Sequence, residues 1–257
     1  MIIGSGLIAS ALGRCGADAL GGTCFYAAGV SNSGCRDERE YLRERTRLES
    51  VLAGTPASER IVYFSTCSIE DPASRNSEYV QHKIRMENLV RERARHLILR
   101  LPQVAGNTPN PHTLLNFLYE RITRSERFHV WGNAMRNIID VEDVVKISMD
   151  LIATEGANGE TINVASPHLL MMLDIVHAME RVLCARAVFD ILDKSSGGRI
   201  DIVRISDSIR RCAIAFGDSY LDGIIAKYYG AHDDEMYAFP ACLFNRQPAF
   251  SSPVWQL

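Results

Sequence analysis

Short apolar runs alternate with longer amphipathic segments through the first hundred residues, and this alternation constrains the fold more than any other feature. Four runs have the length and composition of strands: 1–3, 23–30, 60–65 and 96–101. The segments between them are typical of helices: 7–20, 37–52 and 78–95. The alternation predicts an α/β fold, with a parallel sheet wound right-handedly and helices on both of its faces.

The pattern changes after Pro102. A long loop is expected over 102–113, and polar loops of this length often carry function. Further helices are predicted at 113–123 and 141–153, and strands at 128–131 and 161–164. A hairpin is predicted from residue 185, turning at 195–198, whereas the last thirty residues support no interpretation. We expect a cofactor-binding domain over 1–166, with substrate-region segments in about 103–140, and a substrate-binding region over 167–257.

Composition excludes several classes of protein. The 257 residues carry a formal net charge of −3, without the basic excess of a duplex-DNA binder. No apolar run is long enough to span a bilayer, and the N-terminus lacks the pattern of a secretory signal. Seven cysteines without a CxxC pair are typical of reduced thiols rather than a zinc site. We therefore expect a cytoplasmic protein without nucleic-acid or membrane partners and without a metal.

A glycine pattern, Gly4-x-Gly6-x-x-Ala9, lies between the first strand and the first helix. Glycines at this place allow a pyrophosphate to approach the backbone, and the helix N-terminus stabilises its charge. Turn glycines without a ligand have the same pattern, so the motif alone favours neither interpretation. The acidic residue that usually binds the adenosine ribose is missing, because Asp18, within the predicted helix, is the only acidic residue between Gly6 and Asp37.

Tyr79 and Lys83 are spaced so that they share one face of the helix predicted at 78–95. An ammonium beside a phenol favours the phenolate and lowers the pKa of the tyrosine, which suits general acid/base chemistry. An isolated pair of this spacing often arises by chance. Here it follows a strand that ends in Ser65-Thr66-Cys67-Ser68, whose hydroxyls can bind a carbonyl oxygen. His82, between the pair, is expected to face away from it.

These features together resemble the extended short-chain dehydrogenase/reductase superfamily, in its nucleotide-sugar epimerase, dehydratase and reductase branch. The resemblance runs through much of residues 1–166. Besides the glycine pattern and the Tyr/Lys pair, it rests on further motifs in the same order: Ala27-Ala28-Gly29, the strand over 62–66, Leu99–Gly106, the stretch over 136–144, and Ile162–Ala165. It implies a Rossmann-like doubly wound parallel sheet that lacks the second and third family strands, with a small mixed C-terminal substrate region.

The resemblance also implies roles for individual residues. Thr66 would polarise the substrate carbonyl, Tyr79 would transfer the proton and Lys83 would hold the nicotinamide ribose, with Ser65 as the alternative hydroxyl. The implied cofactor-binding residues are Gly4, Gly6, Leu7, Ile8, Ala27, Ala28, Gly29, Tyr79, Lys83, Leu101, Pro102 and Val104. The implied substrate-binding residues are Ser68, Asn107 and Arg136. Arg136 suits a diphosphate, and a surface salt bridge is nearly as good an explanation.

The resemblance implies an oxidoreductase that uses NAD or NADP on a nucleotide-activated sugar, and we expect reduction of a 4-keto group. Epimerisation at C4 uses the same residues and remains an alternative. Dehydration is disfavoured, because Cys67 and Ser68 stand where dehydratases of this branch have acids. The missing strands leave a third possibility, a binding or regulatory protein that has lost catalysis. By resemblance, the helices at 37–52 and 78–95 would pair in a homodimer.

Overall fold

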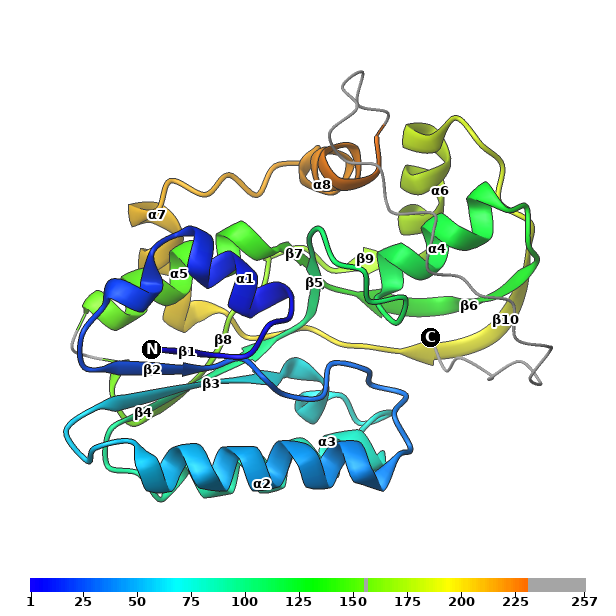
Figure 1. Cartoon of the computed structure of the whole chain (residues 1–257). Coiled ribbons are helices and arrows are strands. Elements are labelled where there is room, and N and C mark those ends of the chain that lie inside the picture. The colour runs from blue at the N-terminus through cyan, green and yellow to red at the C-terminus, as the bar shows by residue number, and fades with distance from the viewer. Residues whose placement is uncertain (155–156, 231–257) are drawn as a thin grey trace.

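The computed structural model describes residues 1–154 and 157–230. Its centre is a parallel sheet whose five strands lie in the order β1-β2-β3-β4-β8 (Figure 1). The strands are β1 (Ile2–Ile3), β2 (Thr23–Tyr26), β3 (Arg60–Thr66), β4 (His96–Leu101) and β8 (Glu160–Asn163). The predicted α/β fold with a parallel sheet is confirmed.

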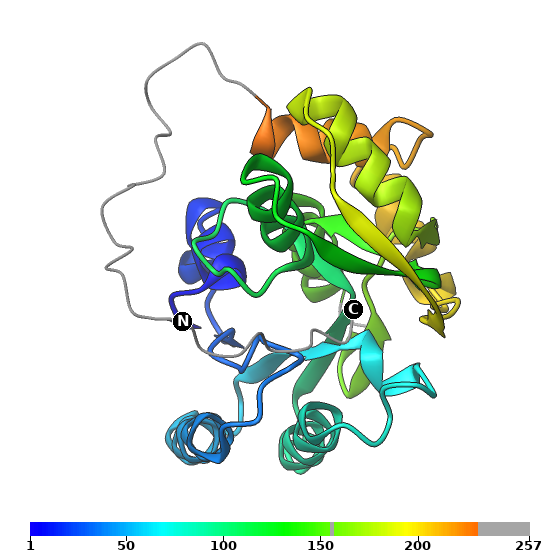
Figure 2. The ribbon, with the colours of Figure 1, turned by 90° about the vertical axis from the view of Figure 1, so that its right-hand side faces the viewer.

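Helices cover both faces of this sheet (Figures 1 and 2). Along β3, Val62 and Phe64 pack on the face of α1 (Leu7–Arg14) and α5 (Val141–Ala153). Ile61 and Tyr63 point to the opposite face, which α2 (Glu38–Gly54) and α3 (Glu78–Arg91) cover side by side (Figure 2). Successive strand residues point to opposite faces, so β3, buried along its whole length, supplies both cores.

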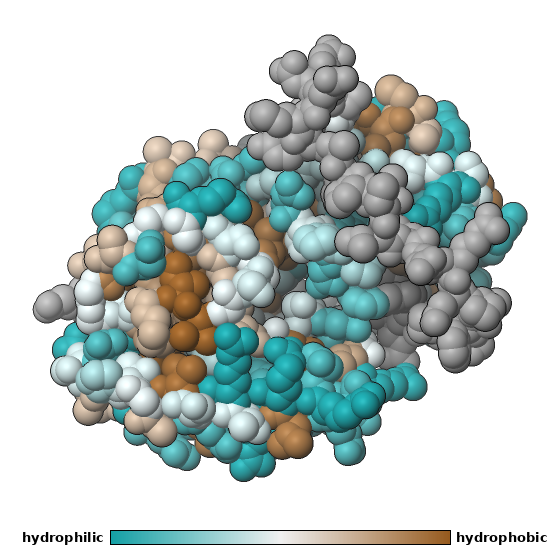
Figure 3. All heavy atoms as spheres, in the orientation of Figure 1, coloured by the Kyte–Doolittle hydropathy of each residue, from teal (hydrophilic) through white to brown (hydrophobic). Residues whose placement is uncertain are grey.

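The first strand forms an edge of the sheet. β1 pairs with β2, through Ile2 opposite Phe25, and among the described residues no strand lies on its other side. The predicted absence of the second and third family strands is thereby confirmed. Apolar side chains gather on this face of the molecule (Figure 3).

The expectation of a uniformly right-handed winding is wrong for the first connection. From β1 to β4 each strand lies beyond the previous one in the same direction. Helix α1 covers one face of the sheet, while α2 and α3 cover the other. The β1-α1-β2 crossover therefore has the opposite hand to the next two, although about 98% of such crossovers are right-handed. The reversal follows from the missing strands. In the complete fold, the chain passes from α1 into a strand on the far side of β1.

A second, smaller unit begins after β4. A three-stranded sheet in the order β10-β6-β9 packs against three helices, and a two-stranded ladder joins β5 to β7. The strands are β5 (Gln103–Ala105), β6 (Phe128–Arg136), β7 (Ile138–Asp140), β9 (Leu170–Met171) and β10 (Phe189–Ser196). The helices are α4 (Leu114–Thr123), α6 (Met172–Leu183) and α8 (Tyr220–Tyr229). The ladder, β9, α6 and α8 were not predicted.

The hairpin expected from residue 185 is wrong. β10 pairs in parallel with β6, and the Phe189 and Phe128 rings stack at 5.8 Å. After Gly197, which has a positive φ of 84°, the chain forms no returning strand. It continues into two short helices, η4 (Val203–Ile205) and α7 (Ser206–Arg211), which pack against the first unit. The boundary proposed at residue 166 remains a prediction.

Two predicted elements differ in length. The helix expected over 7–20 stops at Arg14, because Gly16 has a φ of 75°, and Asp18 lies in a separate 3-10 turn over Ala17–Ala19. β2 ends at Tyr26, and Ala27-Ala28-Gly29 follows it as a loop.

None of the helices described is long and apolar enough to cross a bilayer. Within the same residues no group of acidic, histidine or cysteine side chains has the arrangement of a metal site, and all six cysteines there are unpaired.

Candidate active site

Thr66 and Tyr79 meet at the carboxyl end of β3. Thr66 is the last residue of that strand, and its hydroxyl accepts a hydrogen bond from the Ser68 backbone N–H at 3.1 Å, which caps the 3-10 turn Cys67–Glu70. Tyr79 lies in the first turn of α3. Ser77 is the N-cap of this helix, and its hydroxyl accepts a hydrogen bond from the Val80 N–H. Both side chains are buried. The turn holds the Thr66 hydroxyl, and the cap fixes the start of the helix that carries Tyr79.

The pKa of the Tyr79 phenol is raised, contrary to the expectation from the Tyr/Lys spacing. Burial is the main cause, hydrogen bonding to the Thr66 side chain offsets it only in part, and the charge of Glu44 raises the pKa further. The expected effect of an ammonium is missing because the Lys83 charge is directed at Glu44. Tyr79 is consequently a neutral proton donor at physiological pH.

Lys83 lies in the same helix with its ammonium against a buried carboxylate. Its Nζ atom is 3.0 Å from Glu44 Oε1 and 3.1 Å from the Tyr63 hydroxyl, and 5.9 Å from the centre of the Tyr79 ring. The lysine is only 2% exposed. The structure therefore brings Thr66 and Tyr79 together, with Lys83 behind the tyrosine ring and held by a second set of groups.

Glu44, in the middle of α2, is the residue that sequence reasoning missed. It is fully buried and accepts hydrogen bonds from the Val30 N–H at 2.7 Å, the Tyr63 hydroxyl at 2.7 Å and Lys83. His82 Nε2 lies 3.0 Å from Glu44 Oε2, the oxygen that also accepts from Val30. Burial acts to raise the pKa of Glu44, but Lys83 and the hydrogen bonds from His82, Val30 and Tyr63 hold it well below its usual range. A glutamate in a run of charged residues gave no sign of this in the sequence.

His82 does not face away from the pair as expected. Its ring stacks on Tyr41, with centroids 4.7 Å apart, and shares the Glu44 carboxylate with Lys83.

Ser65, the alternative catalytic hydroxyl, lies in a different cluster. It donates to Glu87 Oε1 at 2.7 Å, and Arg100 and Arg91 pair with the same carboxylate. Ser65 precedes Thr66 in an extended strand, so its side chain points to the opposite face of the sheet. Thr66 is thus the hydroxyl that the fold brings to Tyr79.

The glycine pattern forms the turn between β1 and α1. Gly4 has a φ of +132°, and a Cβ atom there would lie 2.3 Å from the Ala27 carbonyl oxygen, so only glycine fits. Gly6 is exposed, and a Cβ atom on it would meet nothing within 4 Å. No side chain caps the N-terminus of α1, which begins with Leu7 and Ile8. The backbone is therefore open to an anion at this helix end.

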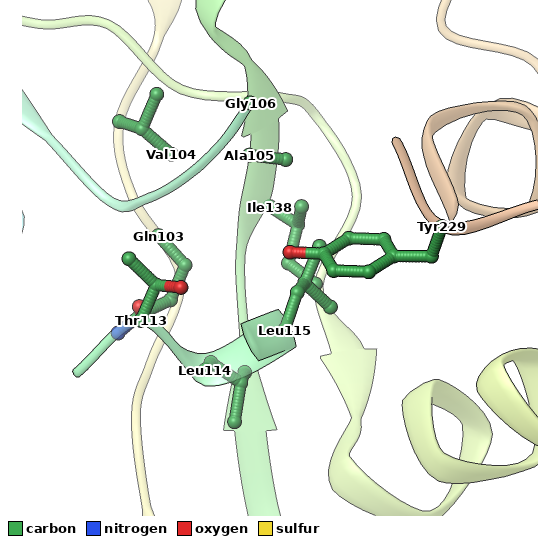
Figure 4. Close-up of a pocket in the computed structure, with 9 residues that line it drawn as sticks. All are labelled: Gln103, Val104, Ala105, Gly106, Thr113, Leu114, Leu115, Ile138 and Tyr229. Atoms are coloured by element: carbon green, nitrogen blue, oxygen red, sulfur yellow. The ribbon is translucent and has the colours of Figure 1, made fainter. Parts of the chain in front are cut away.

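The loop after β4 lies beside this turn. A Cβ atom on Gly106 would be 2.6 Å from Leu7 Cδ1, so the loop packs directly on the start of α1. Leu101 is buried and Pro102 is half-buried. A narrow hollow adjoins the loop (Figure 4), and its lining is Gln103, Val104, Ala105, Gly106, Thr113, Leu114, Leu115, Ile138 and Tyr229.

The predicted substrate residues are dispersed. Asn107 is exposed in the loop, and Ser68 is half-buried beside Thr66. Arg136 donates to the Met135 carbonyl at 2.7 Å and to the Ser196 hydroxyl at 2.9 Å, which ties β6 to β10. Burial lowers the pKa of Arg136, and the Asp71 charge opposes this. A second hollow of about 180 Å³ in the smaller unit has His168, Asp218 and Tyr220 in its lining.

Comparisons with known proteins bear on the family and the fold. The model of the NAD dependent epimerase/dehydratase family matches residues 46–165. The search of curated proteins gave no match. MoeE5 in complex with UDP-glucuronic acid and NAD is similar in fold, with a TM-score of 0.61, 19% identity, and 74% of this chain and 73% of that one covered.

Two further solved structures show the same likeness. UDP-glucuronic acid 4-epimerase from Bacillus cereus, in complex with UDP-glucuronic acid and NAD, has a TM-score of 0.61 at 19% identity, covering 80% of this chain and 74% of its own. RMD from Pseudomonas aeruginosa, complexed with NADPH, has a TM-score of 0.62 at 16% identity, with 80% of this chain and 90% of that one covered. Residues 46–165 of this chain thus match the NAD dependent epimerase/dehydratase family, and the fold is that of the similar solved structures.

Proposed function

We propose that this protein is an NAD(P)-dependent reductase that acts on the 4-keto group of a nucleotide-activated sugar. The observation that carries the proposal is the convergence of the Thr66 hydroxyl, the neutral Tyr79 phenol and the Lys83 ammonium at the carboxyl end of β3. Ligands bind at this end of the strands in open α/β sheets. The similar proteins that bind UDP-sugars with NAD, or NADPH, support the choice of substrate and cofactor.

The residues present fit two of the three parts of a dinucleotide. Gly4, Gly6 and the uncapped start of α1 fit the pyrophosphate. We assign Gly29, Lys83 and Val104 to the nicotinamide and its ribose; of these, Gly29 and the Lys83 ammonium lie against each other. For the adenosine ribose, the described residues offer neither a strand beyond β1 nor an acidic side chain at its end. The choice between NAD and NADP depends on that missing part.

The roles of the side chains follow from their protonation and position. When bound, the reduced nicotinamide supplies a hydride for the carbonyl carbon of the sugar. Tyr79 donates its phenolic proton to the carbonyl oxygen as negative charge develops there, and the Thr66 hydroxyl donates a hydrogen bond to the same oxygen. Lys83, whose ammonium is paired with Glu44, would hold the nicotinamide ribose.

Two observations favour reduction over epimerisation. The raised pKa of Tyr79 keeps the phenol protonated, which suits the proton donor that reduction requires. In addition, β1 is an edge strand among the described residues, so the adenosine end of the cofactor would gain few contacts from them. A weakly held cofactor exchanges readily, and a reductase must exchange it in every turnover.

The test is calorimetric titration with NADH and NADPH, followed by absorbance measurement of cofactor oxidation on adding a UDP-linked 4-keto hexose. We expect stoichiometric oxidation, and Tyr79→Phe should lower turnover by about 10²–10⁴-fold while keeping cofactor affinity. Tyr26→Phe is the control and should retain turnover, because Tyr26 is a buried tyrosine on β2, one strand away from Thr66 on β3. Conversion to a C4 isomer without net oxidation would indicate an epimerase. Failure of the folded protein to bind either cofactor would refute the proposal and favour a non-catalytic binding protein.

A further inference from the structure

Lys83 is held by a group of residues that lies outside the catalytic set of Thr66 and Tyr79. We call it the Lys83 seat, and it consists of Glu44 on α2, Tyr63 on β3 and Gly29 after β2. These residues come from three elements that are separate in sequence and meet beneath the ammonium.

The seat fixes the ammonium from three sides. An ammonium has three N–H donors. One donates to Glu44 Oε1 at 3.0 Å and a second to the Tyr63 hydroxyl at 3.1 Å. Among the described residues no acceptor takes the third. A Cβ atom on Gly29 would lie 2.5 Å from Nζ, so the ammonium lies directly against the backbone there.

Folding stability does not account for such an arrangement. Desolvating a carboxylate and an ammonium together is costly, and apolar residues of the same volume are often as good or better for stability. The seat instead removes the conformational freedom of the longest flexible side chain in the site. The residues of the seat also bind one another: the Tyr63 hydroxyl donates a hydrogen bond to the Glu44 carboxylate at 2.7 Å and accepts one from the Lys83 ammonium.

We propose that Glu44 and Tyr63 are positioning residues that hold the Lys83 ammonium against Gly29 and direct its third N–H to a ribose hydroxyl of the cofactor. The inference rests on the proposed function for the identity of the ligand. The seat itself is independent of that ligand.

The protein offers a closely matched pair of variants for the test. Tyr63→Phe removes the hydroxyl that contacts both Lys83 and the Glu44 carboxylate. Tyr26→Phe removes a hydroxyl that donates to the Glu44 backbone carbonyl at 3.0 Å and does not contact Lys83. Both tyrosines are fully buried, and their rings are 5.9 Å apart. A purely structural effect should therefore appear in both variants.

The first measurement is NMR of the lysine ammonium groups in protein with isotope-labelled lysine. The chain has four lysines, at 83, 146, 194 and 227, and Lys83→Met assigns the signal. We expect slow proton exchange with water for Lys83 in the wild type and in Tyr26→Phe, and exchange at least about tenfold faster in Tyr63→Phe. Equal proton exchange rates in the wild type and Tyr63→Phe, or an equal increase in the two variants, would show that the Lys83 seat does not hold the ammonium.

The second measurement is the Kd for NADH. We expect Tyr63→Phe to weaken binding about five- to tenfold, in the range of one lost hydrogen bond, and Tyr26→Phe to leave it unchanged. Equal weakening in both variants, or none in either, would refute the positioning role. If Tyr63→Phe does not fold, Glu44→Gln, which keeps the size of the side chain, takes its place with the same expectations. If the wild type binds neither nicotinamide cofactor, the proposed function fails, while the exchange measurement still decides whether the seat exists.

Discussion

Replacement of Lys83 by methionine should destabilise the fold strongly, and for a reason that is independent of catalysis. Methionine has a similar length and suits the buried site, so the packing loss is small. The variant leaves the fully buried Glu44 carboxylate without its cation. Coulomb's law at 3.0 Å with an effective dielectric of about 20 gives about 5–6 kcal/mol of attraction. Measured losses for removing one partner of a buried pair are about 3–5 kcal/mol, and we expect Lys83→Met to fall in that range.

The interpretation is tested by a double-mutant cycle with Glu44→Gln, followed by denaturant unfolding at pH 7. The double variant has no unpaired charge, so it should be more stable than Lys83→Met alone. Arg91→Met serves as a control, because Arg91 is partly exposed and Glu87 keeps its two bonds from Arg100. We expect that control to lose only about 1 kcal/mol. Additive losses for Lys83→Met and Glu44→Gln would refute the reasoning.

The pH dependence gives the same prediction a second test. The folded-state pKa of Glu44 lies below its ordinary value of 4.5, so its contribution to stability is complete above that value and is lost as the pH falls below it. In Lys83→Met burial dominates, and Glu44 takes up a proton at a higher pH. The stability deficit of the variant should therefore be largest near pH 7 and shrink towards pH 4. A deficit that does not change with pH would contradict the electrostatic explanation.

Three other changes test other parts of the structure. Gly4→Ala should lower the free energy of unfolding by about 2 kcal/mol or more, because of the positive φ and the contact with the Ala27 carbonyl. Gly13→Ala on α1 is the control and should be neutral or stabilising, and thermal unfolding measures both variants. Thr66→Val should reduce turnover about 10²-fold or more, with recovery in Thr66→Ser, as measured by NADH oxidation. Asp140→Asn weakens the bonds from Lys227 and Tyr228 and should lower stability by about 1–2 kcal/mol, with faster amide exchange in α8; unchanged exchange would show that other contacts hold this helix.

The strands and helices of the first unit could be predicted because their signals are local. β3 is a short apolar run of strand composition, and α2 and α3 begin at the caps Asp37 and Ser77. The hand of the first crossover could not be predicted, since it depends on which strand α1 connects to. The hairpin failed for a similar reason: β10 is a good strand, but its partner β6 lies about sixty residues earlier.

The same distinction applies to the site. Tyr79 and Thr66 were found because a helical spacing and a strand end place them without long-range information. Glu44 was missed because its role depends on α2 lying beside α3, and its burial is the opposite of what a charged helix face suggests. The raised pKa of Tyr79 was missed for the same reason: burial of the phenol is its main cause, and the negative charge of Glu44 raises the pKa further.

The edge strand and the Lys83 seat have a common consequence for how this protein would use its cofactor. A complete doubly wound sheet holds a dinucleotide at both ends, so the adenosine contacts help to place the nicotinamide. Among the residues that the structure describes, β1 ends the sheet, so that help would be missing. The reacting end must then be ordered by the protein before the cofactor arrives, because little binding energy remains to do it afterwards. A lysine fixed by Glu44 and Tyr63 meets this requirement, since its conformational entropy is already lost in folding rather than in binding.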